Sequence, residues 1–306
     1  MKKLNQIGEF GFIAEIEKIF NRICHKKNVI HGIGDDAAVI RHSKKEYLLY
    51  TTDMLIEGVH FLRTQDPEAI GHKALACSIS DIAAMGGEPD FALVSLAFPK
   101  NLNYRFANKL CQGLGKTAKK YKISIIGGDT NSFDKIIICV FLRGMVNKKK
   151  LVLRSKAKKN DLIFVTGDLG ASCRGRHLKF TPRLKESQFL VNNFKINAMI
   201  DISDGLIADL NHILKASKAG AVLKEASIPL SYLADSREDA FYTGEDFELL
   251  FTLPKKYAGK LLSSWPFKNK VKLSCIGEIT AQSQGLKLKT KNNRLKKIKL
   301  GGYRHF

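Results

Sequence analysis

Five short stretches of this sequence place aspartate beside glycine, serine, threonine and aliphatic residues, with no lysine or arginine among them. They are residues 32–39, 50–54, 80–86, 126–130 and 199–205. A carboxylate beside apolar sequence is expected to be partly buried, and burial without a positive partner is costly. Either distant basic residues or divalent cations must therefore balance these acids, and hard cations favour oxygen ligands.

Each of these aspartates has an ordinary structural explanation when it is taken alone. Asp36, Asp129 and Asp204 could cap a turn or a helix, because aspartate commonly accepts hydrogen bonds from nearby backbone amides. Their repeated placement against apolar runs favours a shared role, since functional groups tend to lie on loops at the ends of rigid elements. Hydroxyl groups that could add oxygen ligands or phosphate contacts lie at Thr51, Thr52 and Ser203.

The chemistry that this pattern favours is phosphoryl transfer. Mg²⁺ prefers octahedral oxygen coordination and is usually held by one or two carboxylates together with substrate phosphates. Several carboxylates therefore predict more than one Mg²⁺ ion on a polyphosphate. A structural Ca²⁺ site is the alternative, but no loop of the sequence shows the regular alternation of ligands that such a site uses.

No serine, cysteine or histidine of the sequence stands out as a nucleophile with a base partner. This fits a kinase whose acceptor is itself a phosphate. Such an acceptor has a second pKa of about 6 and is largely ionised at pH 7, so the reaction needs no general base. The obstacle is then the repulsion between two anions, which bound metal ions relieve.

The elements expected to position these residues alternate between helix and strand in both halves of the chain. Helices are predicted over residues 10–23, from the Asp66-Pro67-Glu68 start to Met85, over 104–121, and from 205 to a stop at Gly220. Strands are predicted over 37–40, 47–52, 91–98, 123–126, 136–146, 162–166, 198–202, 247–253 and 271–276. A basic turn at 147–150 predicts a boundary between two α+β domains, residues 1–147 and 148–306.

Composition narrows the class of partner. The chain has 306 residues and a formal net charge of +22, but the excess is mostly dispersed lysine without interleaved base-stacking aromatics. We therefore expect a solvated lysine-rich face that could steer phosphorylated molecules, rather than a specific nucleic-acid surface. Six cysteines without C-x-x-C spacing predict reduced core residues of a cytoplasmic protein. No apolar run has membrane-spanning length or the character of a signal peptide.

Two glycine-containing segments imitate nucleotide-binding loops. Residues 113–117 read Gly-Leu-Gly-Lys-Thr, but the first glycine that a phosphate loop requires is Leu110, and the segment lies in a helical pattern. Residues 32–37 fit G-x-G-x-x-A but lead into a strand rather than a helix. If the protein binds ATP, it does so without either loop.

The acidic stretches belong to a longer series that resembles the thiamine-monophosphate kinases, a family of the superfamily that also contains aminoimidazole ribonucleotide synthetase and selenophosphate synthetase. The matching segments are 32–39, 51–54, 58–61, 80–86, 127–130, 201–206, 244–249 and the ending 302–306. They span nearly the whole chain in the order of the family. The combination of Gly-Val-His-Phe at 58–61 with the Gly-Tyr-x-His-Phe ending is specific to these kinases.

The resemblance implies ATP-dependent phosphorylation of thiamine monophosphate to thiamine diphosphate, by direct in-line transfer assisted by several Mg²⁺ ions, with a monovalent cation left open. It implies a fold of the aminoimidazole ribonucleotide synthetase type, and a homodimer joined through the N-terminal domains with the active site in the cleft between domains. The implied Mg²⁺ ligands are Asp35, Thr51, Thr52, Asp53, Asp81, Asp129, Asp201 and Asp204. The implied ATP contacts are Gly128, Asp129, Arg154 and Ser203, and the implied substrate contacts are His60, Glu245 and Tyr303.

Some alternatives stay open at the level of sequence. Another enzyme of the superfamily, such as aminoimidazole ribonucleotide synthetase, is the second hypothesis, and a basic nucleic-acid-binding protein is a remote third. Selenophosphate synthetase would need a reactive cysteine in a flexible N-terminal loop, whereas Cys24 ends a predicted helix. Asn131-Ser132 replaces the Thr-Arg that often follows Asp-Thr in the family, the basic segment after Gly170 has no predicted geometry, and the separate roles of Asp35 and Asp36, and of Asp246 and Glu248, are not assigned.

Overall fold

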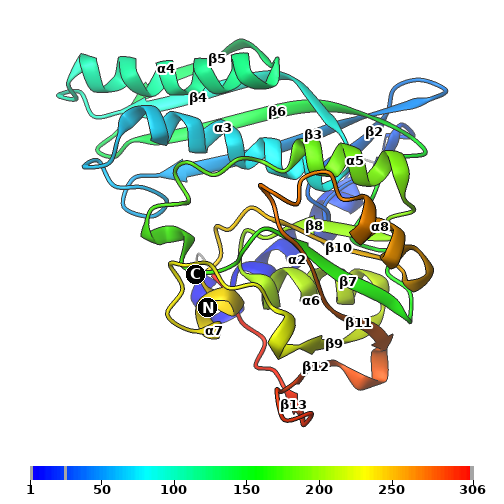
Figure 1. Ribbon diagram of the computed structural model, residues 1–306. Coiled ribbons are helices and arrows are strands. Elements are labelled where there is room, and N and C mark those ends of the chain that lie inside the picture. Colours follow the sequence, from blue (N-terminus) through cyan, green and yellow to red (C-terminus); the bar gives the residue numbers. More distant parts are fainter. Residues whose placement is uncertain (1–2, 24–25, 304–306) are drawn as a thin grey trace.

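The structure, a computed structural model, describes residues 3–23 and 26–303 and builds them around two β-sheets (Figure 1). Cys24 and the closing residues 304–306, on which two of the predictions depend, lie outside the described residues. The fold class is confirmed: each half of the chain combines a mixed sheet with helices. Among the described residues, no helix is both long enough and apolar enough to cross a membrane.

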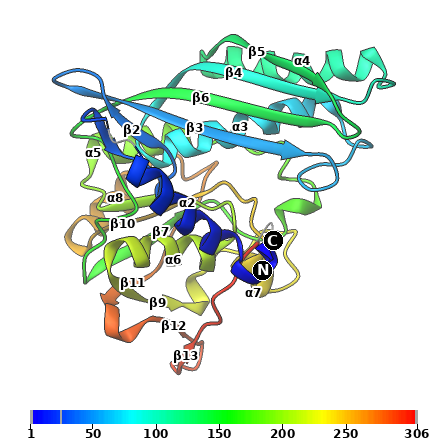
Figure 2. The same ribbon diagram turned by 180° about the vertical axis from the view of Figure 1, so that it is seen from behind.

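The first half contains the elements that surround the six-stranded sheet. They are α1 (Leu4–Ile7), α2 (Glu9–Ile23), β1 (Val29–His31), β2 (Ala38–Arg41), β3 (Glu46–Ile56), α3 (Pro67–Ala84), β4 (Glu88–Phe98), α4 (Tyr104–Tyr121), β5 (Ser124–Ser132) and β6 (Ile137–Asn147). The strand order is β1-β2-β3-β6-β4-β5, and only the β4–β5 pair is parallel. Helices α3 and α4 cover one face of this sheet (Figure 1), while the opposite face of β3, β4, β5 and β6 carries no such cover (Figure 2).

The second half contains the seven-stranded sheet, with strand order β13-β12-β9-β11-β7-β10-β8. Its strands are β7 (Asp161–Thr166), β8 (Ala198–Asp201), β9 (Ala219–Lys224), β10 (Leu249–Pro254), β11 (Leu273–Ala281), β12 (Leu286–Lys289) and β13 (Leu295–Lys297). Its helices are α5 (Leu184–Asn193), α6 (Leu206–Ser217), α7 (Arg237–Tyr242) and α8 (Ala258–Ser264), with short 3-10 turns at Ser172–Arg174, Glu225–Ser227, Lys255–Tyr257 and Gln282–Gln284.

Helix α3 is the element that joins the two halves. It packs on strands β3 and β6 of the first sheet and also touches β8 and α5 of the second half. Its start follows the predicted signal, because the Asp66 side chain accepts a hydrogen bond from the Glu68 amide and Pro67 occupies the first turn. The helix ends at Ala84, so Asp81 lies in its last turn as predicted.

Helices α3 and α4 approach each other closely at two glycines. A Cβ atom on Gly71 would lie 2.0 Å from the Leu110 carbonyl oxygen, and one on Gly113 would lie 2.0 Å from the Glu68 carbonyl oxygen. Gly113 belongs to the segment that imitates a phosphate loop. Its glycine therefore serves helix packing, and the segment is part of α4.

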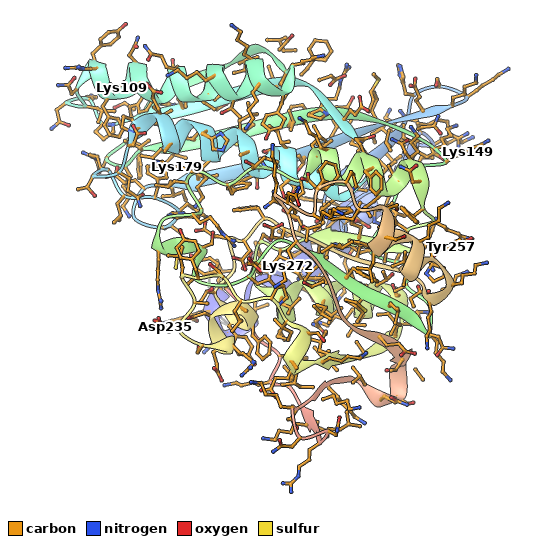
Figure 3. The ribbon with its side chains drawn as sticks, viewed as in Figure 1. Lys109, Lys149, Lys179, Asp235, Tyr257 and Lys272 are labelled. Carbon is orange, nitrogen blue, oxygen red and sulfur yellow. The ribbon has the colours of Figure 1, made fainter. Side chains whose placement is uncertain are left out.

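Several predicted details are wrong. The helix after residue 205 ends at Lys218, which takes the left-handed conformation, and Gly220 lies in strand β9 where a side chain would meet the Ala281 carbonyl oxygen. Cys111 and Cys173 are exposed rather than buried in the core. The dispersed lysines are mostly outside as expected, and Lys149 and Lys179 project from the surface in Figure 3. One lysine, Lys73, is completely buried.

Candidate active site

Three carboxylates from different parts of the chain meet where α3 lies against both sheets. Asp36 precedes β2, Asp81 lies in the last turn of α3, and Asp201 ends β8. One oxygen atom from each lies within 4.8 Å of the others. Burial, followed by the neighbouring charges of Asp53, Asp201 and Asp36, raises the pKa of Asp81 well above its usual range. Burial and then Asp36 raise the pKa of Asp201 to about 8. Such mutual repulsion marks a place that favours a cation.

Hydroxyl groups hold these carboxylates in position. Thr51 Oγ1 donates a hydrogen bond of 2.5 Å to Asp81 Oδ2, and Ser80 Oγ donates one of 2.6 Å to Asp201 Oδ2. On the same side, Ser78 Oγ lies 2.5 Å from Asp53 Oδ2. Side chains alternate along a strand, so Thr51 and Asp53 share the face of β3 that meets α3.

The same alternation sends Thr52 to the other face of β3. Its side chain is exposed, and its Oγ1 lies 3.6 Å from Cys139 Sγ rather than near the carboxylates. Of the two predicted threonine ligands, the structure therefore brings the side chain of Thr51 to the cluster and not that of Thr52.

The neighbouring aspartates that the sequence left unassigned differ in their contacts. Asp35 accepts hydrogen bonds from the backbone amides of Asp36 and Arg154, and burial raises its pKa to about 7. Asp36 lies in the carboxylate cluster, and Arg154 Nη2 donates a 2.6 Å hydrogen bond to its Oδ1. Its Oδ2 is buried and has no hydrogen-bond partner among the described residues. An unpartnered buried carboxylate oxygen beside two further carboxylates fits a divalent cation bound by oxygen ligands.

Arg154 does not lie on a solvated basic surface. Burial opposes the charge of its guanidinium, but the Asp36 carboxylate holds the pKa of Arg154 above its usual range. The side chain faces Asp35 and Asp36 at the edge of the cluster. It therefore brings a fixed positive charge to the same place as the predicted metal ligands.

A second group of possible ligands follows β8. Asp204, Asp209 and His212 each offer an atom within 4.8 Å of the others. Asp209 Oδ2 accepts hydrogen bonds of 3.1 Å from the amides of Asp204 and Gly205, which fixes the turn into α6. Burial lowers the pKa of His212 to about 4, so its imidazole is neutral at pH 7.

A cavity of about 530 Å³ lies beside these groups. All three predicted substrate residues line it, together with Thr52, Asp53, Ser203 and Asp204 of the predicted metal and nucleotide sets. The predicted substrate residues are His60, Glu245 and Tyr303. His60 Nδ1 accepts a 3.0 Å hydrogen bond from the Ile56 amide, so a neutral ring carries its proton on Nε2. A cavity of this size, with few polar groups converging on it, suits a small-molecule ligand.

The acidic loop 244–248 forms one wall of this cavity. The Glu245 carboxylate contacts Lys73 Nζ and lies 3.1 Å from His177 Nδ1. Asp246 accepts hydrogen bonds from the Gly170 amide and from Arg176 Nη2.

Glu248, at the other end of that loop, is bound by Arg183 through two hydrogen bonds of 2.6 Å. Arg176, His177 and Arg183 all come from the basic segment that follows Gly170. That basic segment therefore holds the loop 244–248 in place, through the ion pairs of Asp246 and Glu248.

Two predicted residues lie apart from the cluster within a single chain. Gly128 and Asp129 are on β5, at the exposed edge of the first sheet, and line a separate cavity of about 410 Å³. Strands β6 and β4 lie between β5 and β3. Three strand spacings of about 4.8 Å therefore place Asp129 about 14 Å from strand β3, which carries Asp53. Gly128 packs closely, since a Cβ atom there would lie 1.8 Å from the Val94 carbonyl oxygen.

Comparison with known proteins identifies the family of the chain. Residues 34–146 match the family model of the AIR synthase related protein, N-terminal domain, and residues 144–289 match that of its C-terminal domain. A thiamine-monophosphate kinase of Buchnera aphidicola from Schizaphis graminum is 38% identical, with 98% of this chain and 99% of the relative covered. The enzyme of that name from Escherichia coli K12 is 34% identical over 91% of this chain and 92% of its own length. The chain belongs to the thiamine-monophosphate kinase family.

Solved structures agree with that membership. The structure of AaThiL complexed with AMPPCP and TMP has a TM-score of 0.85 and 32% identity, and covers 100% of this chain and 99% of its own. The thiamine monophosphate kinase of Aquifex aeolicus has a TM-score of 0.77 and 30% identity, with 96% and 99% covered. A HypE–HypF complex, 20% identical with a TM-score of 0.75, shares the fold. The protein is thus a thiamine-phosphate kinase of the aminoimidazole ribonucleotide synthetase fold.

Sequence reasoning missed several residues of this kinase site. Ser78 and Ser80 were overlooked although both flank the aspartate motif, and Lys73 was counted among the solvated lysines. A usable signal existed for Lys73, because residues 69–84 contain no other basic side chain after His72. The criterion that singled out the aspartates, a charge in an apolar run, also applies to this lysine.

Proposed function

We propose that the protein transfers the γ-phosphoryl group of ATP directly to the phosphate of thiamine monophosphate, giving thiamine diphosphate and ADP. The observation that carries this proposal is the meeting of two residue sets in one place. The predicted substrate contacts line a single cavity, and the Asp36–Asp81–Asp201 cluster adjoins it through Asp53. Two phosphorylated ligands placed there would bring their phosphates towards the carboxylates.

We propose Mg²⁺ as the cation that the cluster takes. Asp36, Asp81 and Asp201 would hold it at one place, and Asp204 with Asp209 at a second. Bound Mg²⁺ would offset the charges of the phosphates and the carboxylates, which otherwise repel each other. Arg154 adds a fixed positive charge, and Ser203 lines the cavity beside Asp204.

The residues of the chain position the substrates rather than move protons. The acceptor phosphate is largely ionised at pH 7, and its own oxygen serves as the nucleophile. We therefore propose a single in-line displacement with no phosphoenzyme, in which the P–O bond to the acceptor forms as the bond to ADP breaks. Asp53 and Asp81, held by Ser78 and Thr51, keep the acidic side of the site rigid.

The first experiment incubates the purified protein with ATP, Mg²⁺ and thiamine monophosphate and measures thiamine diphosphate and ADP. Equal amounts of both products are expected. No product, together with turnover of an aminoimidazole precursor, would overturn the proposal in favour of aminoimidazole ribonucleotide synthetase. ATP made chiral at its γ-phosphorus then tests the route: one displacement inverts the configuration, and retention would indicate a phosphoenzyme.

We also propose that the protein is a homodimer joined through the bare face of the first sheet. Phe91, Leu93, Ile126 and Phe141 are exposed there and line a hollow of about 280 Å³ with Arg143. Exposed apolar patches of this kind mark interaction sites. Residues 1–147 would form the dimerising, Mg²⁺- and ATP-binding domain, and residues 148–306 would complete the cleft. Gly128 and Asp129 would then meet the nucleotide near the subunit boundary.

Light scattering during size-exclusion chromatography measures this oligomeric state. A dimeric mass is expected, and Phe141→Asp should give a monomer because it buries a charge in the proposed interface. Tyr104→Asp is the matched control, since Tyr104 is exposed on α4, across the sheet from the bare face. A monomeric wild-type protein at micromolar concentration would refute the proposed dimer.

A further inference from the structure

We propose that Lys73, with His177, is a positioning residue that fixes the Glu245 carboxylate in the substrate cavity and thereby controls affinity for the thiamine phosphate. This inference rests on the proposed function. It assigns a role to a buried lysine that belongs to neither the predicted metal ligands nor the predicted nucleotide contacts. Lys73 is only 1% exposed and lies in the middle of α3.

The ammonium group of Lys73 lies among three partners. Its Nζ donates to the His60 carbonyl oxygen at 2.7 Å and to Glu245 Oε1, and lies 2.8 Å from His177 Nδ1. A lysine ammonium has three donors and no acceptor, and the third donor meets His177 Nδ1 when the proton of that imidazole is on Nε2. Lys73 lines the same cavity, but its donors face these three partners, so it acts on a ligand through them.

Those partners come from both halves of the molecule. His60 follows β3 in the first half, whereas His177 and Glu245 belong to loops of the second half. Lys73 therefore ties the backbone of one predicted substrate residue to the side chain of another. The geometry across the cavity depends on this ammonium group, because Lys73 and His177 are the two basic side chains that pair with Glu245 among the described residues.

Glu245 is held in a conformation that needs such support. Its φ angle of 55° lies in the left-handed region, which is unfavourable for residues other than glycine. Its amide donates a 2.7 Å hydrogen bond to the Ser203 carbonyl oxygen, which aims the side chain into the cavity. The two other acids of the loop are occupied by Arg176 and Arg183. Of the three acids in this loop, Glu245 is the one that lines the cavity.

The network also keeps Glu245 ionised. Burial favours the neutral acid, but the adjacent His177 side chain and the charge of Lys73 hold the pKa of Glu245 below its usual value. The side chain is 25% exposed, so one part of the carboxylate faces the cavity. An oriented carboxylate suits a ligand with a cationic ring or an amino group, and thiamine has both a thiazolium and an aminopyrimidine ring. We infer that Lys73 orders the Glu245 carboxylate before the ligand binds, so that less conformational entropy is lost on binding.

The test compares Lys73→Met, Glu245→Gln and the double variant, with Lys116→Met as a matched lysine control at an exposed pair on α4. The readouts are the Kd of thiamine monophosphate in the presence of AMPPCP, the KM of each substrate, and the urea midpoint. Lys73→Met should weaken thiamine monophosphate binding about 10- to 100-fold, as loss of an orienting partner does elsewhere. The KM for ATP should stay within about 2-fold. The double variant should bind no more weakly than the worse single variant, since both remove the same contact.

Three results would overturn the inference. They are a larger effect of Lys73→Met on ATP than on thiamine monophosphate, additive effects in the double variant, and a Kd equal to that of Lys116→Met. If Lys73→Met does not fold, His177→Asn replaces it, and an unchanged Kd for thiamine monophosphate there refutes the positioning role. Wild-type turnover is measured first and tests the proposed function separately. If the wild type is inactive, the urea midpoints still decide whether Lys73 and Glu245 are coupled.

Discussion

The carboxylate cluster predicts an unusual pH dependence of stability in the metal-free protein. Asp201 is only 3% exposed, and its pKa of about 8 in the folded protein compares with an ordinary value of 3.8. Between these two values the folded state binds a proton that the unfolded chain has lost. Stability must therefore fall as the pH rises through this window, opposite to the behaviour of a carboxylate in an ion pair.

The size of the effect follows from the pKa values. Raising the pH from 7 to 8 costs about 1 kcal/mol through Asp201 and about 0.4 kcal/mol through Asp35, whose pKa is about 7. Histidines that burial keeps neutral have the opposite effect on stability, because between pH 7 and 8 their imidazoles lose protons only in the unfolded chain. His212, whose pKa burial lowers to about 4, returns about 0.1 kcal/mol, and the lowered pKa values of His31 and His72 act in the same direction.

The net loss is thus about 1 kcal/mol per pH unit, or roughly 2–4 °C in the thermal midpoint. Asp81 and Asp209, whose pKa values also lie well above the ordinary range, add to it. The Mg²⁺ proposed for this cluster would displace the same protons on binding, so it should stabilise the protein more at pH 8 than at pH 6.

Circular dichroism melts in EDTA and in Mg²⁺, at half-unit steps from pH 6 to 8.5, measure both effects. The control is Asp201→Asn, which removes one titrating carboxylate and should lessen the loss between pH 7 and 8 by about 1 kcal/mol. A metal-free midpoint that rises from pH 7 to 8 would refute the reasoning. So would equal stabilisation by Mg²⁺ at pH 6 and pH 8.

Three further predictions concern single contacts. Asp53→Asn should lower kcat about 100-fold or more while the fold is retained. Thiamine diphosphate formation measures the activity and circular dichroism the fold, and Asp235→Asn at an exposed site is the control. Equal activity of the two variants would remove Asp53 from the site. Arg183→Met leaves Glu248 buried without its bidentate partner and should cost about 3–5 kcal/mol in urea unfolding, most of which Glu248→Leu should restore; an unchanged midpoint would contradict this. Gly71→Ala should cost about 1–3 kcal/mol because its Cβ would meet the Leu110 carbonyl oxygen, whereas Gly115→Ala on α4, with open space around it, should be neutral or stabilising, and equal effects would argue against the close helix contact.

Local patterns predicted the frame of the molecule well. The aspartate cap and proline at the start of α3 act within one turn, so the sequence around Asp66 contains the whole signal. The aspartate stretches likewise predicted acids in apolar surroundings, and Asp81 and Asp201 do meet. The prediction that Gly220 ends a helix was wrong because glycine also permits close approach in a sheet. Gly220 lies in β9 and faces the Ala281 carbonyl oxygen of β11.

The parts that escaped prediction depend on contacts between distant segments. Neither Lys73 nor His177 has a partner close in sequence, and 172 residues separate Lys73 from Glu245. The basic segment after Gly170 had no predicted geometry for the same reason. Its Arg176 and Arg183 find their acids only when β7 and β10 pair. Long-range ion pairs of this kind leave no periodicity in the sequence.

Helix α3 sets the spacing between the groups of the site. Lys73, Ser78, Ser80 and Asp81 project from fewer than three turns, and their partners come from the loop 244–248, β3 and β8. One inserted residue between Lys73 and Ser78 would rotate the groups on either side by about 100° relative to each other and shift them by about 1.5 Å. The substrate wall and the acidic cluster could not then both keep their partners. The spacing within this helix is therefore a stricter requirement than the length of any loop that leads to it.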